Sequence, residues 1–432
     1  MRRRDLLGGA VGALLTAGVL GSTSACGSSG PSGGGGGDQL QLWALQDAQY
    51  VRVVQPAIDT FNAGAKAKVR FSGFVNDAYK QKLQVSMGSP QAPDIFFNWG
   101  GGNLAQFVDA KQVVDLTDRT AGLAGDFLPS VLSVGQVAGR QYALPMNGIQ
   151  PVIFFYHKAV FAKAGLQPPR TWDELLSVVD AFKARGVTPI ALPGSQGWTE
   201  LMYLEYLLDR VGGPDKFAAV AAGKPGAWSD PAMLKAVTMC QDLAERGAFG
   251  TNFASVNYDN TGASRLFATG KAAMFLMGSW EYATQLTNNP TFIKGGQLGW
   301  LPFPSVPGGA GDPAAVVGNP SNYYSVSAGS KHADVAVDFL TRTLTSESYV
   351  KALIDVGQVP AVKGVEAKLA GTPGADFTTF TYQLVSKAPS FTQSWDQALS
   401  PSVGAELLTN LQKLFLAKLS PAQFVAAMGT AR

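Results

Sequence analysis

The sequence predicts an α/β protein with two lobes, each a mostly parallel sheet flanked by helices. Strand-like and helix-like segments alternate from residue 39 onward, a pattern typical of sheets with helices on both faces. About 395 of the 432 residues follow residue 37, more than one hydrophobic core usually organises. Ligands bind such sheets at the carboxyl ends of the strands, so the loops at those ends are where a site is expected.

The first lobe begins with three strand and helix pairs. Apolar alternation and helical periodicity predict strands at 39–45, 67–74 and 94–97, with a helix that follows the first strand and extends to about 63 and another at 77–87. The loops after these strands are 46–48, 75–77 and 98–103. We therefore expect these three loops to line one crevice.

The second lobe repeats the alternation. Thr171 and Glu174 form a capping box, and apolar residues follow on one helical face until Gly186. A strand at 187–192 then leads into the loop 193–198. Another helix-like run, 233–243, contains Cys240, which we expect to be a buried thiol.

The first 37 residues predict export. A charged head, an apolar run too short to span a bilayer and small residues before Cys26 are typical of a signal peptide, here 1–25. Cys26 lies where a lipoprotein would receive its diacylglycerol, although Thr23 stands where that pattern usually has Leu, so ordinary secretion remains an alternative. The twin arginine suggests the route for folded cargo, with the general secretory route left open. We expect a glycine-rich tether at 26–37 and a body held at the extracellular face of the cell membrane.

Composition narrows the possible partners and chemistry. The net charge falls from +3 to +1 without the leader, so nucleic acid is not an expected partner. His157 and His332 are the only histidines, which leaves little material for a histidine metal site or a Ser-His-Asp triad. We expect neither a metal nor another cofactor.

The loop after the third strand is the sharpest local signal. Trp99 offers a flat apolar face, and Gly100 with the two following glycines would let the backbone amides approach a ligand. The loop lacks the glycine spacing and the Gly-Lys-Ser/Thr ending of phosphate loops. The alternative is a tight turn with Trp99 tucked into the core.

Five segments in sequence order resemble the maltose-type (family 1) extracellular solute-binding proteins, the carbohydrate receptors of bacterial ABC importers. They are 93–118, 142–175, 270–280, 322–325 and 357–361. The resemblance implies a two-lobed type II periplasmic-binding-protein fold, no enzymatic activity, a monomer, and an ABC permease as partner. It also implies three chain crossings, near 145–152, 299–303 and 356–362, which divide the body into 38–148 and 301–357 for the first lobe and 149–300 and 358–432 for the second.

A sugar site needs aromatic platforms and hydrogen-bonding groups in fixed positions. Trp280 and Trp395 match places where the family puts stacking residues, and Trp99, Trp198 and Tyr323 follow. We interpret Trp43 and Trp172 as structural. Gly100 is expected to contribute its backbone, and the side chains expected to form hydrogen bonds are Asp47, Asn76, Asn98, Asn147, Glu281, Asn319, Asn322 and Asp396.

The predicted function is capture of a sugar, most simply a short oligosaccharide, by closure of the two lobes and its delivery to the permease. One alternative is a secreted glycoside hydrolase in which Glu281 and Asp396 flank the bond. Another keeps the fold but binds a non-sugar solute such as a polyamine, a metal complex or an anion, for which Arg265 would be a place to look.

Overall fold

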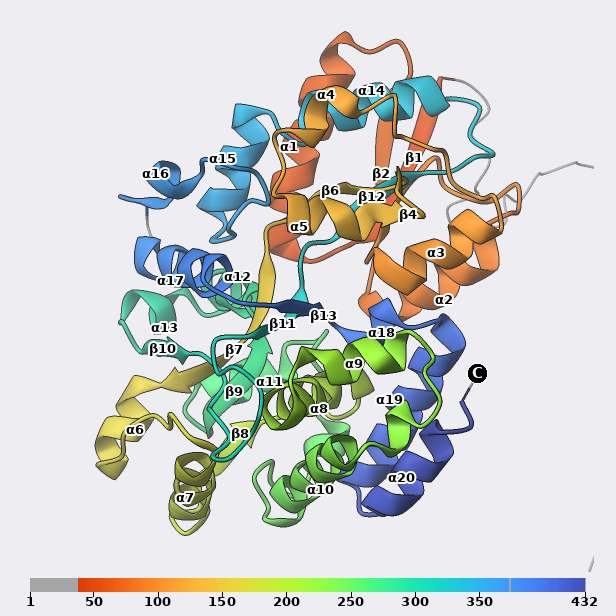
Figure 1. Cartoon of the computed structure of the whole chain (residues 1–432). Coiled ribbons are helices and arrows are strands. Elements are labelled where there is room, and N and C mark those ends of the chain that lie inside the picture. The colour runs from red at the N-terminus through yellow and green to blue at the C-terminus, as the bar shows by residue number, and fades with distance from the viewer. Residues whose placement is uncertain (1–37, 373, 432) are drawn as a thin grey trace, which may run out of the picture. The chain divides into compact units, whose positions relative to one another are not determined.

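The computed structural model describes residues 38–372 and 374–431, so the predicted signal peptide, Cys26 and the tether lie outside it. Two separate hydrophobic cores organise these residues (Figure 1). The first runs from Leu40 to Ile149 and resumes from Tyr323 to Leu369. The second runs from Val152 to Val317 and resumes from Phe377 to Met428. The elements around each core are called the first and the second lobe.

The first lobe contains a five-stranded sheet in the order β2-β1-β3-β12-β6. Strand β1 pairs in parallel with β2 and β3, whereas β12 pairs antiparallel with β3 and β6. A separate hairpin joins β4 (Gln136–Val137) and β5 (Arg140–Gln141). The strands of the main sheet are β1 (Gln39–Leu45), β2 (Lys68–Phe74), β3 (Ile95–Asn98), β6 (Leu144–Pro145) and β12 (Tyr323–Val326).

Helices pack on the first sheet through apolar faces. In α1, for example, the buried residues repeat at helical spacing. The helices are α1 (Ala48–Gly64), α2 (Asn76–Ser86), α3 (Gly101–Asp109), α4 (Ala121–Ala124), α5 (Pro129–Leu132), α14 (Ala333–Thr343), α15 (Glu347–Asp355) and α16 (Glu366–Leu369), with a 3₁₀ turn, η1 (Ser133–Gly135).

The second lobe contains a sheet in the order β13-β11-β7-β9-β8, with β10 also paired to β7. Two pairs of neighbouring strands are parallel, β11 with β13 and β8 with β9, and the other pairs are antiparallel. The strands are β7 (Gln150–His157), β8 (Thr188–Ala191), β9 (Ala272–Gly278), β10 (Leu298–Leu301), β11 (Val316–Asn319) and β13 (Phe391–Gln393).

The capping box predicted at the start of a second-lobe helix is confirmed, because Thr171 Oγ1 accepts from the Glu174 amide and Glu174 returns to the Thr171 amide. Cys240 is fully buried, as predicted. The helices are α6 (Lys158–Ala164), α7 (Trp172–Lys183), α8 (Gly197–Gly212), α9 (Pro214–Ala221), α10 (Pro231–Glu245), α11 (Gly262–Ala268), α12 (Trp280–Asn288), α13 (Pro290–Lys294), α17 (Ala375–Ser386), α18 (Trp395–Ala398), α19 (Pro401–Phe415) and α20 (Pro421–Met428), with 3₁₀ turns η2 (Ala227–Ser229) and η3 (Phe253–Ser255).

The predicted lobe boundaries at 301 and 358 differ from the observed core membership. Phe303 and Val317 pack in the second core, and Val359 and Leu369 pack in the first. The core changes instead between 149 and 152, between 317 and 323, and between 369 and 377. Pro302 near the first of these boundaries, and Gly357 and Pro360 near the second, each lie within one lobe and were not specific signals.

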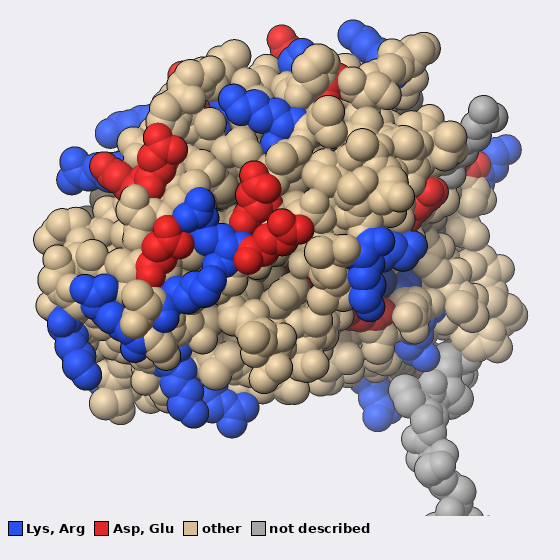
Figure 2. All heavy atoms as spheres, turned by 90° about the horizontal axis from the view of Figure 1, so that it is seen from below, with Lys and Arg blue, Asp and Glu red and all other residues tan. Residues whose placement is uncertain are grey.

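The sheets are mixed, whereas the sequence predicted mostly parallel ones. The antiparallel strands β12 and β7 are those that follow a crossing, since a chain returning from the other lobe enters its sheet from the opposite end. In the part of the chain that the structure describes, no helix has the length and apolarity needed to cross a bilayer. Figure 2 shows acidic and basic side chains interspersed among other residues on the face seen from below.

Candidate ligand-binding site

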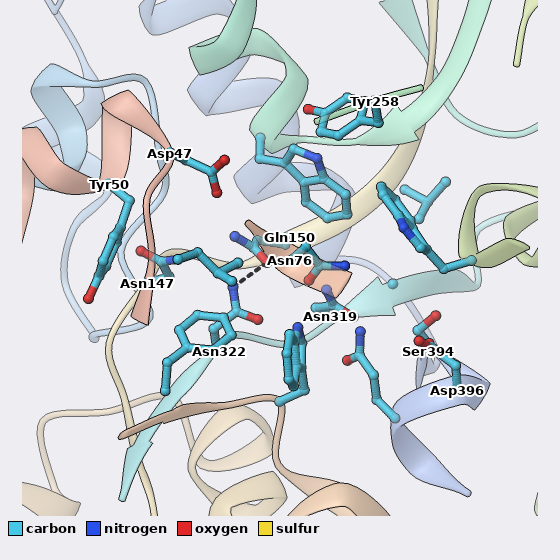
Figure 3. Close-up of a pocket in the computed structure, with 18 of the residues that line it drawn as sticks. Asp47, Tyr50, Asn76, Asn147, Gln150, Tyr258, Asn319, Asn322, Ser394 and Asp396 are labelled. Atoms are coloured by element: carbon cyan, nitrogen blue, oxygen red, sulfur yellow. Dashed lines mark hydrogen bonds between the residues drawn. The ribbon is translucent and has the colours of Figure 1, made fainter. Parts of the chain in front are cut away.

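A pocket lies where the two lobes face each other, and it encloses about 930 Å3 of space, part of it open to solvent (Figure 3). Both lobes and two of the chain crossings line it. The lining residues are Leu45, Asp47, Gln49, Tyr50, Asn76, Lys80, Phe97, Trp99, Asn147, Gln150, Val152, Trp198, Met202, Tyr258, Asp259, Trp280, Gly318, Asn319, Asn322, Gln358, Ser394, Asp396 and Gln397.

Aromatic rings line the pocket from both lobes. In the second lobe the Trp198 and Trp280 ring centroids lie 6.3 Å apart with planes tilted by 49°, and Tyr258 meets Trp198 edge to face. In the first lobe Trp99 packs edge to face on Phe97, with centroids 5.0 Å apart. Such rings offer apolar faces to the C–H surfaces of a ligand.

Amide side chains at the chain crossings provide the polar groups of the pocket. Asn322 Nδ2 donates to Gln150 Oε1 at 3.1 Å, the bond dashed in Figure 3. The side-chain oxygens of Asn147, Asn319 and Asn322 are buried without a hydrogen-bond partner. Buried acceptors in proteins are normally satisfied, so these oxygens are suited to the hydroxyl donors of a bound molecule.

Two carboxylates lie in different surroundings. The Asp396 Oδ2 atom is 2.9 Å from Lys80 Nζ, an ion pair that joins the lobes, and its Oδ1 is buried without a partner. Loss of hydration between the lobes, together with the negative charge of Asp259, raises the pKa of Asp47 to about 6, although both side chains remain accessible from the cleft. Asp47 therefore exchanges its proton close to neutral pH.

Glu205 of α8 supports the pocket from behind. It is buried and accepts hydrogen bonds from Ser394 Oγ at 2.7 Å and from the Trp395 amide at 2.8 Å. Burial raises its pKa to about 8. These bonds fix the start of α18, and hence the position of Asp396.

Most of the residues predicted for the site are brought together in this pocket. Three predicted loops meet there as expected from the strand order, and the crossings add amide side chains. The predicted residues that line the pocket are Trp280, Trp99, Trp198, Asp396, Asn322, Asp47, Asn76, Asn147 and Asn319.

Two predicted aromatic platforms are wrong, because both rings belong to a core. Trp395 is 1% exposed and stacks on Phe217 with centroids 4.6 Å apart. It starts the short helix α18, in which successive side chains point in different directions, so Asp396 faces the pocket and Trp395 does not. Tyr323 is fully buried, and its hydroxyl donates to the Val131 carbonyl at 2.8 Å.

Three further predicted residues lie outside the lining. Asn98 Oδ1 accepts from the Gly100 amide at 2.9 Å, so Asn98 shapes the loop that carries Trp99. Gly100 has φ of 71°, which favours glycine, and is needed for that turn. Glu281 is fully buried and accepts from Tyr258 Oη at 3.0 Å, and burial raises its pKa to about 7.

Gly101 and Gly102 face the other lobe and not a ligand. A Cβ added at Gly102 would lie 2.5 Å from the Leu399 carbonyl oxygen and 2.6 Å from that of Ala398, both in the second lobe. Gln393 Nε2 donates to the Trp99 carbonyl at 2.7 Å across the same contact. The absence of side chains here allows α3 to approach α18 closely.

Several lining residues were missed by the sequence analysis. Tyr50 and Lys80 lie one helical turn after Asp47 and Asn76, so helical spacing from the predicted loop residues was an available signal. Tyr258 lies in an irregular segment without a local signature. The other polar lining residues that the sequence analysis missed include Gln150, Asp259, Gln358, Ser394 and Gln397.

Within residues 38–372 and 374–431, no cluster of three or more His, Cys, Asp or Glu side chains has a geometry that could hold a metal ion. Glu281 and Asp396, the pair considered for glycoside hydrolysis, do not face each other in the pocket, because Glu281 is not part of its lining.

Comparison with known proteins agrees with this architecture. The profile of the bacterial extracellular solute-binding protein family matches residues 46–351. The diacetylchitobiose-binding protein DasA of Streptomyces coelicolor is 26% identical over 382 residues, covering 85% of each chain.

Two solved structures are also similar over most of their length. A chitin oligosaccharide binding protein has 27% identity and a TM-score of 0.82, covering 91% of this chain and 98% of its own. A structure from work on xylan utilization by Caldanaerobius polysaccharolyticus has 27% identity and a TM-score of 0.81, covering 90% and 98%. With the family profile spanning more than half of its residues, the chain belongs to the bacterial extracellular solute-binding proteins.

Proposed function

We propose that this protein captures a short oligosaccharide between its lobes and delivers it unchanged to an ABC-type permease. The observation that carries this proposal is the combination, in one pocket, of indole rings from both lobes with side-chain oxygens that lack a hydrogen-bond partner. Sugars present C–H faces that pack on aromatic rings and hydroxyl groups that donate to such oxygens.

The names of related proteins support the same ligand class. DasA is named for diacetylchitobiose, and one structural neighbour is named for chitin oligosaccharides. Another comes from work on xylan utilization. All three names concern β-linked or amino-sugar-containing glycans, which makes xylo-, cello- and chito-oligosaccharides the first ligands to test.

Capture would occur by closure. Ligand contacts made from both lobes favour the closed form, in which the lobes touch. The ligand can shift the equilibrium between open and closed forms only by as much as its contacts favour the closed form. Trp99 and Asn76 belong to the first lobe, whereas Trp280 and Trp198 belong to the second. A sugar that touches all four would stabilise the closed form, which a permease could then recognise.

The proposal includes export and anchoring. The chain would be lipidated at Cys26 and held at the extracellular face of the membrane, as a monomer. Replacement of Cys26 by Ala should release the protein into the medium without changing its affinity for sugar in solution. Retention of the Cys26→Ala protein in the membrane fraction would contradict the lipid anchor.

Isothermal titration calorimetry against xylo-, cello-, chito-, malto-, galacto- and raffinose-type sugars tests the proposed function. At least one sugar should bind without added metal or nucleotide and raise the melting temperature by mass action. Chromatography of the sugar recovered from the protein should show it intact. Silence across the panel, or recovery of cleaved or otherwise altered sugar, would refute the proposal, and the second result would favour the hydrolase.

A further inference from the structure

One end of the pocket is rich in acceptors and poor in positive charge. It is formed by Asp47, Tyr50 and Asn147 from the first lobe, which lie together in Figure 3, and by Asp259 from the second. We call this group the acidic end.

Asp47 occupies the N-cap position of α1 but does not cap it. A carboxylate at that position usually accepts from an amide in the first turn, whereas the Asp47 side chain makes no such bond. Among the described residues, no hydrogen-bond donor or cation contacts this carboxylate. Asp47 is therefore available to a ligand.

Two buried neighbours also lack partners. Tyr50 is 3% exposed and Asn147 is 7% exposed, and the Tyr50 hydroxyl and the Asn147 Oδ1 atom are buried without a hydrogen bond. Both side chains line the pocket on the same side as Asp47, and the Tyr50 hydroxyl points away from the Asp47 carboxylate in Figure 3. The cost of leaving buried polar atoms unpaired indicates that this end is built to meet a polar group.

The second lobe adds negative charge on the other side. Asp259 accepts from Gln196 Nε2 at 3.1 Å, and the same amide lies 3.4 Å from Asp77 Oδ2 of the first lobe. A neutral amide is thus the donor between two carboxylates of opposite lobes. The charge of Asp259 also reaches Asp47, whose ionisation it opposes.

The charges of the lining residues do not balance. Three carboxylates, Asp47, Asp259 and Asp396, line the pocket with one cationic side chain, Lys80. Lys80 is held by Asp396, with Nζ 2.9 Å from Oδ2. The charge of Lys80 also reaches Asp259, but no described cation forms an ion pair with Asp47 or Asp259, and no described group of acidic side chains there has a geometry suited to a metal.

We infer that the acidic end binds the ammonium group of an amino sugar, so that the oligosaccharide captured by this protein carries at least one free amine. This inference rests on the proposed function and narrows it to a ligand class. A protonated amine supplies up to three N–H donors and a positive charge, which matches acceptors contributed by Asp47, Asn147 and Asp259. A neutral sugar would supply hydroxyl donors but no compensating charge.

Three disaccharides with one skeleton test this inference: the β-1,4-linked dimer of glucosamine, its di-N-acetylated form and cellobiose. Calorimetry is carried out at a pH at which the sugar amine is protonated and the carboxylates are ionised. The free amine should bind about tenfold more tightly than either neutral sugar, the magnitude of one charge-assisted hydrogen bond. The inference is overturned if the free amine binds no more tightly than the neutral sugars, or does not bind while any neutral sugar of the panel does. Either result leaves the proposed function intact.

Variants locate the effect. Asp47→Asn with Asp259→Asn should remove the preference for the amine over the two neutral sugars, because the amides keep an oxygen acceptor but lose the negative charge. Asp59→Asn is the matched control, since Asp59 lies on the same helix α1 outside the pocket. A preference that survives in the double variant overturns the assignment to these residues. Stabilisation by calcium chloride alone, lost in the double variant, would identify a metal site instead and also overturn it.

Discussion

We expect closure of the lobes to depend on the missing side chain of Gly102, and Gly102→Ala tests this. The residue lies in the first turn of α3 with a backbone conformation open to alanine, yet its Cβ would come within 2.5 Å of the Leu399 carbonyl oxygen of the other lobe. Real Cβ atoms do not approach backbone oxygens so closely. The lobes must separate locally for the variant to accommodate the methyl group.

The magnitude follows from overpacking. Inserting a methyl group into a filled contact costs about 1 to 3 kcal/mol, and the cost falls only on the arrangement in which the lobes touch. Sugar affinity should therefore weaken by about 5-fold to 150-fold. The ligand-free protein can open, and alanine is favoured over glycine in a helix by about 0.5 to 1 kcal/mol, so its melting temperature should stay unchanged or rise.

Calorimetry with the best sugar and thermal unfolding without sugar measure the two effects. Gly122→Ala is the matched control, because nothing lies within 4 Å of a Cβ at that position of the first lobe, and its affinity should equal that of the wild type. If Gly102→Ala bound sugar within twofold of the wild type, the contact between α3 and α18 would not be part of the ligand-bound state. A lower melting temperature together with weaker binding would indicate general damage and not a block to closure.

Three further predictions concern Trp280 with Trp395, the Lys80–Asp396 pair, and Glu200. Trp280→Ala should weaken sugar binding at least tenfold in calorimetry, with little change in the free energy of unfolding. Trp395→Ala should instead lower the free energy of unfolding by about 3 to 5 kcal/mol, because its ring is part of the core. Loss of binding without loss of stability in Trp395→Ala would contradict the assignment of Trp395 to the core. Lys80→Met should weaken binding by leaving Asp396 unpaired, and addition of Asp396→Asn should restore part of the loss; additive losses in the double variant would argue against the pair as a link between the lobes. Burial raises the pKa of Glu200 from 4.5 to about 9, so the folded state holds a proton that the unfolded state releases. The free energy of unfolding should therefore fall by up to about 1.4 kcal/mol per pH unit as the pH rises between those values. Glu200→Gln should flatten this slope in denaturant titrations, and an unchanged slope would contradict the raised pKa.

Local sequence was sufficient to place the loops of the site. The strands ending at Leu45, Phe74 and Asn98 were predicted within a residue or two, because alternation and helical periodicity reflect which face is buried. Parallel pairing then required their carboxyl ends to meet at one edge. The sequence alone therefore assigns Asp47, Asn76 and Trp99 to one crevice.

Local sequence was insufficient to decide which way a side chain points within a short element. Trp395 and Asp396 are neighbours, yet one fills a core and the other lines the pocket, because the start of α18 donates hydrogen bonds to Glu205, a residue 190 positions away in the chain. Glu281 is likewise held in the interior by a hydrogen bond that it accepts from Ser264 of α11. Contacts of this kind join segments that have no common sequence pattern.

The sequence by itself determined the α/β class, the two cores and the positions of the first-lobe loops, since each of these follows from hydrophobic period and chain length. Only the tertiary structure decided where the chain crosses, which aromatic rings face the pocket, and that Gly101 and Gly102 serve the contact between lobes. The physical reason is that burial pattern is written locally along the chain, whereas the partner that fills each space comes from another segment.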